Sequence, residues 1–207
     1  MLSTLYIGSG DVHALMMGRT SAGYLRLLQR FVSGIVPHYN ALASPIDALR
    51  TGAILEERFY QTLPFEWFPQ YRVQSDEMDV FRASLDFAKL DEGRVVDFIE
   101  LKTVNLDEYI ENIQPIVDDN DALLDFLKRK RPSYYNQIQE QMYCAGLDVA
   151  HLVFLSVTSY DDAENYARDI KENEYVMVTV PRDNDTINEI KEKGKLFQTI
   201  RDELKNN

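Results

Sequence analysis

Residues 95–103 read Val95-Val96-Asp97-Phe98-Ile99-Glu100-Leu101-Lys102-Thr103, and this stretch decides the fold. It is rich in β-branched and aromatic residues, which favours a strand, and the side chains of a strand alternate between its two faces. Glu100 and Lys102 therefore lie on one face, while Ile99 and Leu101 lie on the other. We expect the second face to meet apolar packing and the first to carry a polar site.

The preceding residues predict the partner strand of a hairpin. Residues 80–89 form a second β-rich stretch, and Asp91-Glu92-Gly93 between the two stretches is typical of a hairpin turn. Strict alternation predicts a common face for Ser84, Asp86 and Ala88. The hairpin can then bring Asp86 beside Glu100.

This pair of carboxylates predicts a metal site. Two adjacent carboxylates repel each other, and their burial is costly unless a cation shares the site. Oxygen ligands suit hard divalent ions, so magnesium fits best, with manganese as a substitute. The Lys102 ammonium can reach the same space, where it can orient an attacking water or stabilise charge that develops on a phosphate.

The Glu-x-Lys triplet by itself is a weak signal. The chain also contains Glu189-Ile190-Lys191 and Glu203-Leu204-Lys205, and the second repeats the Glu-Leu-Lys tripeptide itself. Both fall in a charged C-terminal segment whose pattern predicts a solvated helix. The strand context and Asp86 distinguish Glu100 from these copies. An exposed, salt-bridged face of the sheet is the alternative interpretation.

Further elements are expected around the hairpin. Helices are predicted at 12–16, 21–31, 44–63, 132–145 and 183–205, and strands at 67–74, 151–157 and 175–180. Residues 107–130 are expected to be helical in parts, with a break at Pro115. We therefore expect one domain over 1–207 of the α/β (mixed α+β) class. It would comprise a helical part at 1–63, a catalytic sheet core at 64–180 and a C-terminal helix at 183–205.

The overall charge of the chain is acidic, at −12 from 34 Asp and Glu residues against 22 Lys and Arg residues. Nucleic-acid-binding proteins normally contact phosphates through Lys and Arg, so this charge favours an alternative function. That alternative is a non-catalytic acidic mimic of DNA, or an inhibitor protein. Against it, several acidic residues stand in metal-site order, and an enzyme that cleaves DNA needs only a locally basic channel.

The single cysteine, Cys144, excludes an internal disulfide and a zinc or iron–sulfur centre held by several cysteines. The sequence shows neither a signal-peptide pattern nor an apolar run of membrane-spanning length. We therefore expect a cytoplasmic protein with no membrane partner.

Two helical segments add candidate site residues. Gly52 precedes Glu56 by one helical turn and would allow close backbone approach where a carboxylate can point into a site. Within 132–145, two pairs share a helical face: Gln139 with Tyr143, and Gln137 with Gln141. These amides and the phenol can contact phosphate or the attacking water, although a solvent-facing polar surface is the alternative.

The order of these motifs resembles a known family. It runs Gly52-x-x-Leu55-Glu56, Ser84-Leu85-Asp86, Glu100-Leu101-Lys102 and Gln137-Ile138-Gln139-x-x-x-Tyr143, after an early Ile7-Gly8-Ser9-Gly10-Asp11-Val12-His13. Over about residues 7–157, the chain is similar to the YqaJ-like branch of phage recombination exonucleases. That branch includes lambda exonuclease and lies in the PD-(D/E)xK nuclease superfamily. The resemblance implies a restriction-endonuclease-like core, with a central mixed β-sheet flanked by helices.

The resemblance also implies roles for individual residues. Magnesium would be held by Asp86, Glu100, the Leu101 carbonyl and, directly or through water, Glu56. Lys102 would position the nucleophile and Gln139 would support it, for in-line hydrolysis of a phosphodiester by metal-activated water. DNA contacts are expected from Ser9, Arg19, Ser84, Gln137 and Tyr143.

Some positions depart from the family pattern. Two arginines that grip the 5'-phosphate in lambda-type enzymes are replaced by Ser3 and Glu108, and Gly10 stands where a serine is expected. These losses bear on selection of the DNA end more than on metal chemistry. The resemblance otherwise implies 5'-to-3' processing of double-stranded DNA ends for recombination or repair in a bacterial or phage-infected cell. It also implies a homotrimer and a single-strand annealing protein as partner.

Overall fold

The computed structural model describes residues 5–34, 47–158 and 169–206. Within these ranges a six-stranded mixed sheet forms the centre. Its strands are β1 (Ile7–Gly8), β2 (Trp67–Gln74), β3 (Phe81–Asp91), β4 (Arg94–Asn105), β5 (Val149–Val157) and β6 (Tyr175–Pro181). β3 pairs antiparallel with β2 and β4, and its first residues pair parallel with β1. β5 pairs parallel with β4 and antiparallel with β6.

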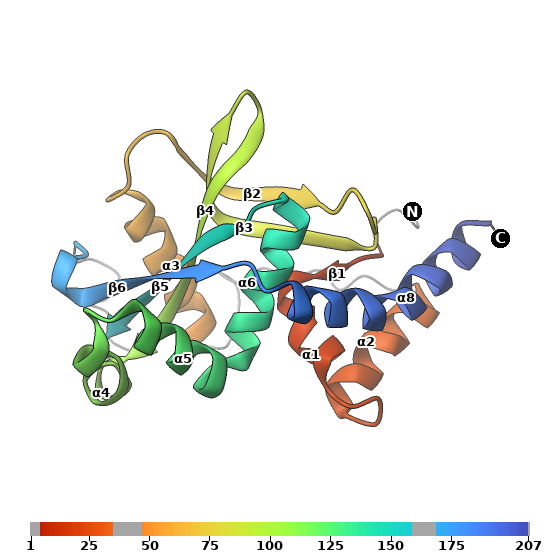
Figure 1. Cartoon of the computed structure of the whole chain (residues 1–207), viewed down its shortest axis with the longest axis horizontal. Helices are drawn as coiled ribbons and strands as arrows, with labels where there is room; N and C mark the ends of the chain where they lie inside the picture. Colours follow the sequence, from red (N-terminus) through yellow and green to blue (C-terminus); the bar gives the residue numbers. More distant parts are fainter. Residues whose placement is uncertain (1–4, 35–46, 159–168, 207) are drawn as a thin grey trace.

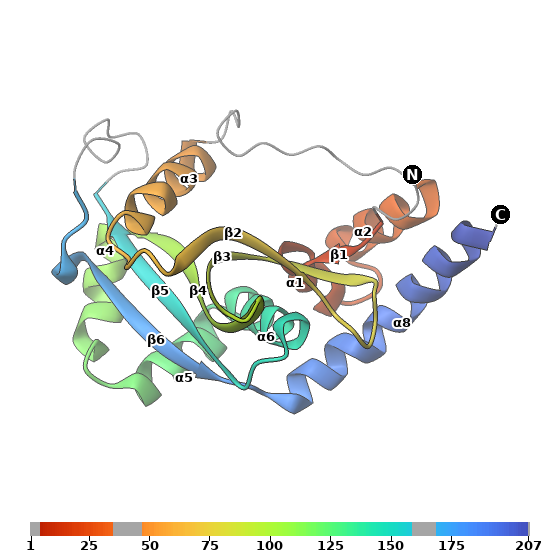
Figure 2. The ribbon, with the colours of Figure 1, turned by 90° about the horizontal axis from the view of Figure 1, so that it is seen from above.

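Helices cover both faces of this sheet. They are α1 (Val12–Met16), α2 (Ala22–Ser33), α3 (Asp47–Tyr60), α4 (Leu106–Glu108), α5 (Asn120–Lys130), α6 (Pro132–Ala145) and α8 (Asn184–Asn206). α3 lies on one face, and α5 and α6 lie on the other (Figure 2). α1, α2 and α8 gather near β1 at one end of the sheet (Figure 1). The expected mixed α/β fold with a central sheet flanked by helices is confirmed.

The apolar residues of β4 divide between two apolar clusters, as the alternation of side chains along a strand predicts. Ile99 and Leu101 belong to the smaller cluster, where they pack with Leu55 and Phe59 of α3. Phe98 belongs to the larger cluster, which contains the buried residues of α6. The two faces of β4 are therefore buried against different helices, and Glu100 and Lys102 face away from the cluster under α3.

Local signals in the sequence locate several element ends. The Ser21 hydroxyl accepts a hydrogen bond from the Tyr24 amide at 3.2 Å, which caps α2. Gly146 ends α6 with φ of 72°. The β3–β4 turn uses Glu92 and Gly93 with φ of 47° and 80°, the positive values that a two-residue hairpin loop needs.

One predicted helix boundary needs correction, whereas a predicted break in a helix is confirmed. The third helix ends at Tyr60, three residues before the expected 63, and its expected start at 44 lies outside the described residues. The expected break at Pro115 is confirmed: a 3₁₀ turn over Gln114–Ile116 follows a π-helical turn over Tyr109–Ile113, and the next α-helix begins at Asn120.

Alternation fails in β3, at the position of Asp86. Leu85 and Ala88 pack in the larger cluster, whereas Phe87 packs in the smaller one. Two residues three apart cannot share a face of a regular strand. The predicted common face is therefore wrong for Ala88, because the strand changes its facing between Leu85 and Ala88, whereas Ser84 and Asp86 line one pocket.

Two glycines differ in whether a larger residue could replace them. A Cβ at Gly194 of α8 would lie 2.3 Å from Phe81 Cζ, so this close crossing of α8 over β3 requires glycine. A Cβ at Gly52 would lie 3.9 Å from Thr103 Oγ1, an ordinary contact. The approach of α3 to β4 is therefore not one that only glycine allows.

In the ranges that the structure describes, no helix combines the length and the apolar character needed to cross a bilayer.

Candidate active site

The candidate site lies in a fork between β3 and β4. Their paired residues end at Phe87 and Ile99. Beyond this point the Leu101 amide donates to the Asp86 carboxylate at 2.9 Å. The Ser84 carbonyl accepts from the Gln141 amide at 3.1 Å. Side chains thus satisfy backbone groups that a continuous ladder would have paired, and the two strands separate.

A pocket occupies this fork, and residues from the helices on both faces of the sheet line it. It is lined by Ser9, Glu56, Ser84, Asp86, Glu100, Leu101, Lys102, Tyr134 and Gln137, among others. Glu56 comes from α3 on one face of the sheet, and Gln137 comes from α6 on the other. Eight residues that the sequence analysis named as site candidates therefore meet in one place.

Glu100 is the most enclosed of the acidic residues, with a side chain 2% exposed. Its Oε1 accepts from Lys102 Nζ at 2.6 Å and from Gln137 Nε2 at 2.5 Å. Its Oε2 accepts from Gln141 Nε2 at 2.6 Å. A buried carboxylate is stable only with such charge-assisted partners, and α6 provides two of the three.

The other carboxylates are not compensated to the same degree. Burial raises the pKa of Asp86 well above its usual value, and the nearby charges of Glu100 and Glu56 raise it further. Burial also raises the pKa of Glu56, although a hydrogen bond from Gln70 opposes this. Asp86 and Glu56 therefore resist ionisation in this pocket, and an added cation would relieve that resistance.

Lys102 remains a cation in this setting. Burial by itself would lower its pKa, but the carboxylates of Glu100 and Asp86 outweigh burial and the pKa is raised. The ammonium also lies 5.2 Å from the centre of the Tyr134 ring, over its face. Lys102 is therefore a fixed positive charge and hydrogen-bond donor rather than a base.

The carboxylate oxygens of this pocket are of the type that magnesium prefers. In this structure, however, the Glu100 carboxylate is bonded to the Lys102 ammonium and to the side-chain amides of Gln137 and Gln141. Among the described residues, no three His, Cys, Asp or Glu side chains enclose a common point. Magnesium needs only one or two carboxylates, because it keeps several of its waters. Asp86 and Glu100 meet that need once Glu100 exchanges an amide or ammonium donor for the ion.

Three predicted site residues lie elsewhere. Gln139 is fully buried, donating to the Pro181 carbonyl at 2.9 Å and accepting from the Asp183 amide at 2.8 Å. It ties α6 to the segment between β6 and α8, so its expected support of the nucleophile is not seen. The other pair named from the sequence, Gln137 and Gln141, holds Glu100.

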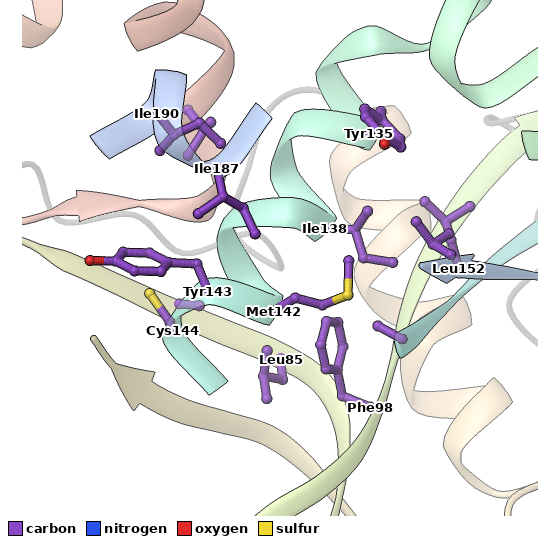
Figure 3. Packing of buried hydrophobic residues seen from close by; sticks show 14 of the residues in the cluster. Leu85, Phe98, Tyr135, Ile138, Met142, Tyr143, Cys144, Leu152, Ile187 and Ile190 are labelled. Atoms are coloured by element: carbon purple, nitrogen blue, oxygen red, sulfur yellow. The ribbon is translucent and has the colours of Figure 1, made fainter. Parts of the chain in front are cut away.

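Tyr143 and Arg19 are also outside the pocket. Tyr143 packs in the larger cluster near Ile187 of α8 (Figure 3). Its ring contacts Phe81 at 5.8 Å between centroids, and burial raises the pKa of its hydroxyl to about 12. Arg19 is exposed in the turn between α1 and α2 and does not line the pocket. Neither residue therefore lies where the expected contact with DNA at the pocket could form.

Two features near the pocket were missed from the sequence. Gln70 of β2 bonds to both Glu56 and Ser84. A run of four basic residues, 128–131, covers the end of α5, and its last member, Arg131, pairs with Glu108 and lies 6.0 Å from the Tyr134 ring. The run was readable as four consecutive cations, whereas no local pattern marks Gln70. Ser3, the other position where an arginine of the family is replaced, lies outside the described residues.

The sheet and the site residues together define a restriction-endonuclease-like fold, and known structures confirm it. One match is LHK-Exo, an alkaline exonuclease from Laribacter hongkongensis in complex with dAMP. It has a TM-score of 0.63 and 20% identity, covering 97% of this chain and 89% of that chain. Another is a phage-related exonuclease from Haemophilus somnus 129PT, with a TM-score of 0.60 and 17% identity, covering 98% and 96%.

These matches confirm at the level of the fold the resemblance to phage-type exonucleases. No family model and no curated protein sequence matches the chain. The identities are low, so the likeness lies in the path of the backbone rather than in the residues.

Proposed function

We propose that this protein is a magnesium-dependent DNA exonuclease. One observation carries the proposal: Glu56, Asp86, Glu100 and Lys102, which lie far apart in the sequence, line one pocket in a fork of the sheet. The fold around this pocket is shared with an alkaline exonuclease and a phage-related exonuclease. Clustered carboxylates with a protonated lysine are the groups that metal-assisted phosphodiester hydrolysis requires.

A bound magnesium ion would supply Lewis-acid activation of water and of the scissile phosphate. Asp86, Glu100 and the Leu101 carbonyl would hold it, with Glu56 acting directly or through water, and manganese would serve as a substitute. Lys102, kept protonated by its carboxylate neighbours, would orient the nucleophile and stabilise charge on the phosphate.

Basic residues beside the pocket support contact with DNA despite the net charge of −12. Arg131 lies 6.0 Å from the ring of Tyr134, which lines the pocket, and shares that ring with Lys102. A local group of cations next to acidic ligands is what a phosphate backbone needs on entering a metal site. Ser9, Ser84 and Gln137 line the same pocket and would contact the phosphates.

The finer details of the proposal rest on the family resemblance. They are 5'-to-3' processing of double-stranded DNA ends, a role in phage-type recombination or repair, a homotrimer, and a single-strand annealing protein as partner. Light scattering on the purified protein tests the trimer, and a monomer in solution would contradict it.

The test of the function uses linear duplex DNA labelled at either end, incubated with the protein and magnesium. We expect degradation that EDTA abolishes and that is lost in Lys102→Ala and Glu100→Ala. Release of label from the 5' end first would support the proposed polarity. If the wild type is inert with both magnesium and manganese on duplex and single-stranded DNA, the acidic-mimic alternative replaces this proposal.

A further inference from the structure

Gln70 has an unusual backbone conformation for a residue within a strand. Of the residues that the structure describes, two other than glycine have a positive φ: Gln70 at 52° and Glu92 at 47°. Glu92 lies in the hairpin turn, where the loop geometry requires such a value. Gln70 lies inside β2, where no turn demands it. Strain of this kind persists only when the surroundings impose it, and it is concentrated at functional sites.

The register of the sheet places Gln70 against the candidate metal ligands. Pro69 pairs with Phe87 and Tyr71 pairs with Leu85, so Gln70 stands opposite Asp86. This is also the point where β3 changes its facing between the two apolar clusters. The irregularity in β2 and the irregularity in β3 therefore coincide at the mouth of the pocket.

The side chain of Gln70 joins two walls of that pocket. Its Nε2 donates to Glu56 Oε1 on α3, and its Oε1 accepts from the Ser84 hydroxyl at 3.1 Å. Glu56 and Ser84 both line the pocket. One carboxamide thus serves a carboxylate and a hydroxyl at once, with each atom in its proper role as donor or acceptor.

Folding stability does not account for this arrangement. The side chain of Gln70 is exposed, and the hydrogen bonds of an exposed side chain make only a modest net contribution to stability. The strained backbone, in contrast, costs free energy that glycine at this position would not. A residue that costs stability while holding two pocket residues is better explained by what those residues do.

We propose that Gln70 is a positioning residue: its left-handed backbone turns the carboxamide toward the pocket, where it fixes the Glu56 carboxylate and the Ser84 hydroxyl for the divalent ion and the substrate phosphate. The inference rests on the function proposed above. It adds to that function a residue outside the sequence motifs and assigns it an effect on ion binding through Glu56. Gln70 itself contacts neither the ion nor the reacting atoms.

Two variants separate the backbone of Gln70 from its side chain. Gln70→Gly removes the carboxamide and relieves the positive φ, so the protein should melt at the wild-type temperature or above it. Gln70→Asn tolerates the left-handed region but is one methylene too short to bridge Glu56 and Ser84. Gln74→Ala is the matched control, because Gln74 is an exposed amide on the same strand with partners Asp79 and Arg82 outside the pocket.

The measurement is manganese binding to the DNA-free protein by calorimetry, together with the melting temperature. We expect Gln70→Gly and Gln70→Asn to weaken manganese binding about 10-fold, the usual effect of losing a residue that orients a metal ligand. Gln74→Ala should bind manganese as the wild type does. Wild-type affinity in Gln70→Gly or Gln70→Asn would overturn the inference.

A double-variant cycle tests whether Gln70 acts through Glu56. In a Glu56→Gln background, Gln70→Gly should change manganese affinity less than about twofold, because the group that Gln70 orients no longer ligates. An undiminished 10-fold loss in that background would contradict the positioning role. The proposed function fails separately, if the wild type neither binds manganese nor cleaves DNA.

Discussion

The tripeptide Glu-Leu-Lys occurs twice in this chain, and the two copies have different environments. In β4, Glu100 is 2% exposed and bonds Lys102 at 2.6 Å, while Leu101 packs under α3. In α8, Glu203 is exposed and Lys205 instead pairs with Asp79 at 3.2 Å. Residues two apart share a face in a strand but not in a helix. The same three letters therefore form a site in one element and a surface in the other.

The largest difference between the copies should be in catalysis. We expect Glu100→Gln and Lys102→Ala to lower the rate of DNA degradation about 10³-fold, because the first would remove a ligand of the ion and the second would remove the charge that stabilises the phosphate. Glu203→Gln and Lys205→Ala should change the rate less than about twofold. Rates on labelled linear duplex in magnesium, corrected for the folded fraction, check this. Equal losses from both copies would contradict the assignment.

A second contrast lies on α6, between amides that face Glu100 and one that faces the fold. Gln139→Ala leaves the Pro181 carbonyl and the Asp183 amide without their partner and should cost about 2–3 kcal/mol of stability. Its rate per folded molecule should stay near wild type. Gln137→Ala should do the reverse, with a small stability change and a rate about 10-fold lower. Urea denaturation and rate assays on both variants decide between the two roles.

The carboxylates of the pocket should destabilise the folded protein when no metal ion is bound. Asp86→Asn keeps an acceptor for the Leu101 amide and removes a carboxylate whose pKa is raised by burial and by its acidic neighbours. In EDTA at neutral pH the variant should be more stable than the wild type by about 1 kcal/mol, and in magnesium it should lose activity.

The sign of the pH dependence follows from the raised pKa of Asp86. The folded state holds this proton more tightly than the unfolded state, so stability is lost as pH rises from about 4 through the raised pKa. The gap between Asp86→Asn and wild type should therefore close toward low pH. Denaturation curves between pH 4 and pH 8 measure it, and a gap that widens on acidification would refute this account.

The smallest effect should come from the surface copy. Lys205 and Asp79 are an exposed pair, so Lys205→Ala should cost about 0.2–1 kcal/mol. High salt should remove most of that cost, because screening weakens exposed ion pairs. Urea denaturation in low and high sodium chloride tests it. A larger, salt-independent loss would mean that this tripeptide has a buried role as well.

Much of the fold was predictable because local signals agreed with it. The hairpin turn at Asp91-Glu92-Gly93, the cap at Ser21 and the stop at Gly146 each depend on a few neighbouring residues. The strand-face rule placed Glu100, Lys102 and Leu101 correctly for the same reason. Local chemistry is sufficient where a backbone conformation is set within one or two turns.

The errors share a cause as well. Gln137 and Gln139 lie two residues apart on one helix, and the sequence cannot tell which of the two faces the sheet. The alternation rule failed at Asp86 because β3 changes its facing where it leaves β4. Gln70 carried no signal, since its backbone conformation is imposed by residues distant in the chain. Each error concerns how one element meets another.

The sequence by itself determined the elements, the hairpin and the chemical types of the site: carboxylates and a lysine at strand spacing. Only the tertiary structure decided that β3 and β4 fork beyond Phe87 and Ile99, so that Glu56 from one helical layer and Gln137 from the other line one pocket. The physical reason is the distance along the chain over which each effect acts. Propensity and alternation act over a few residues, whereas burial of two apolar clusters on opposite faces of the sheet sets where the helices lie.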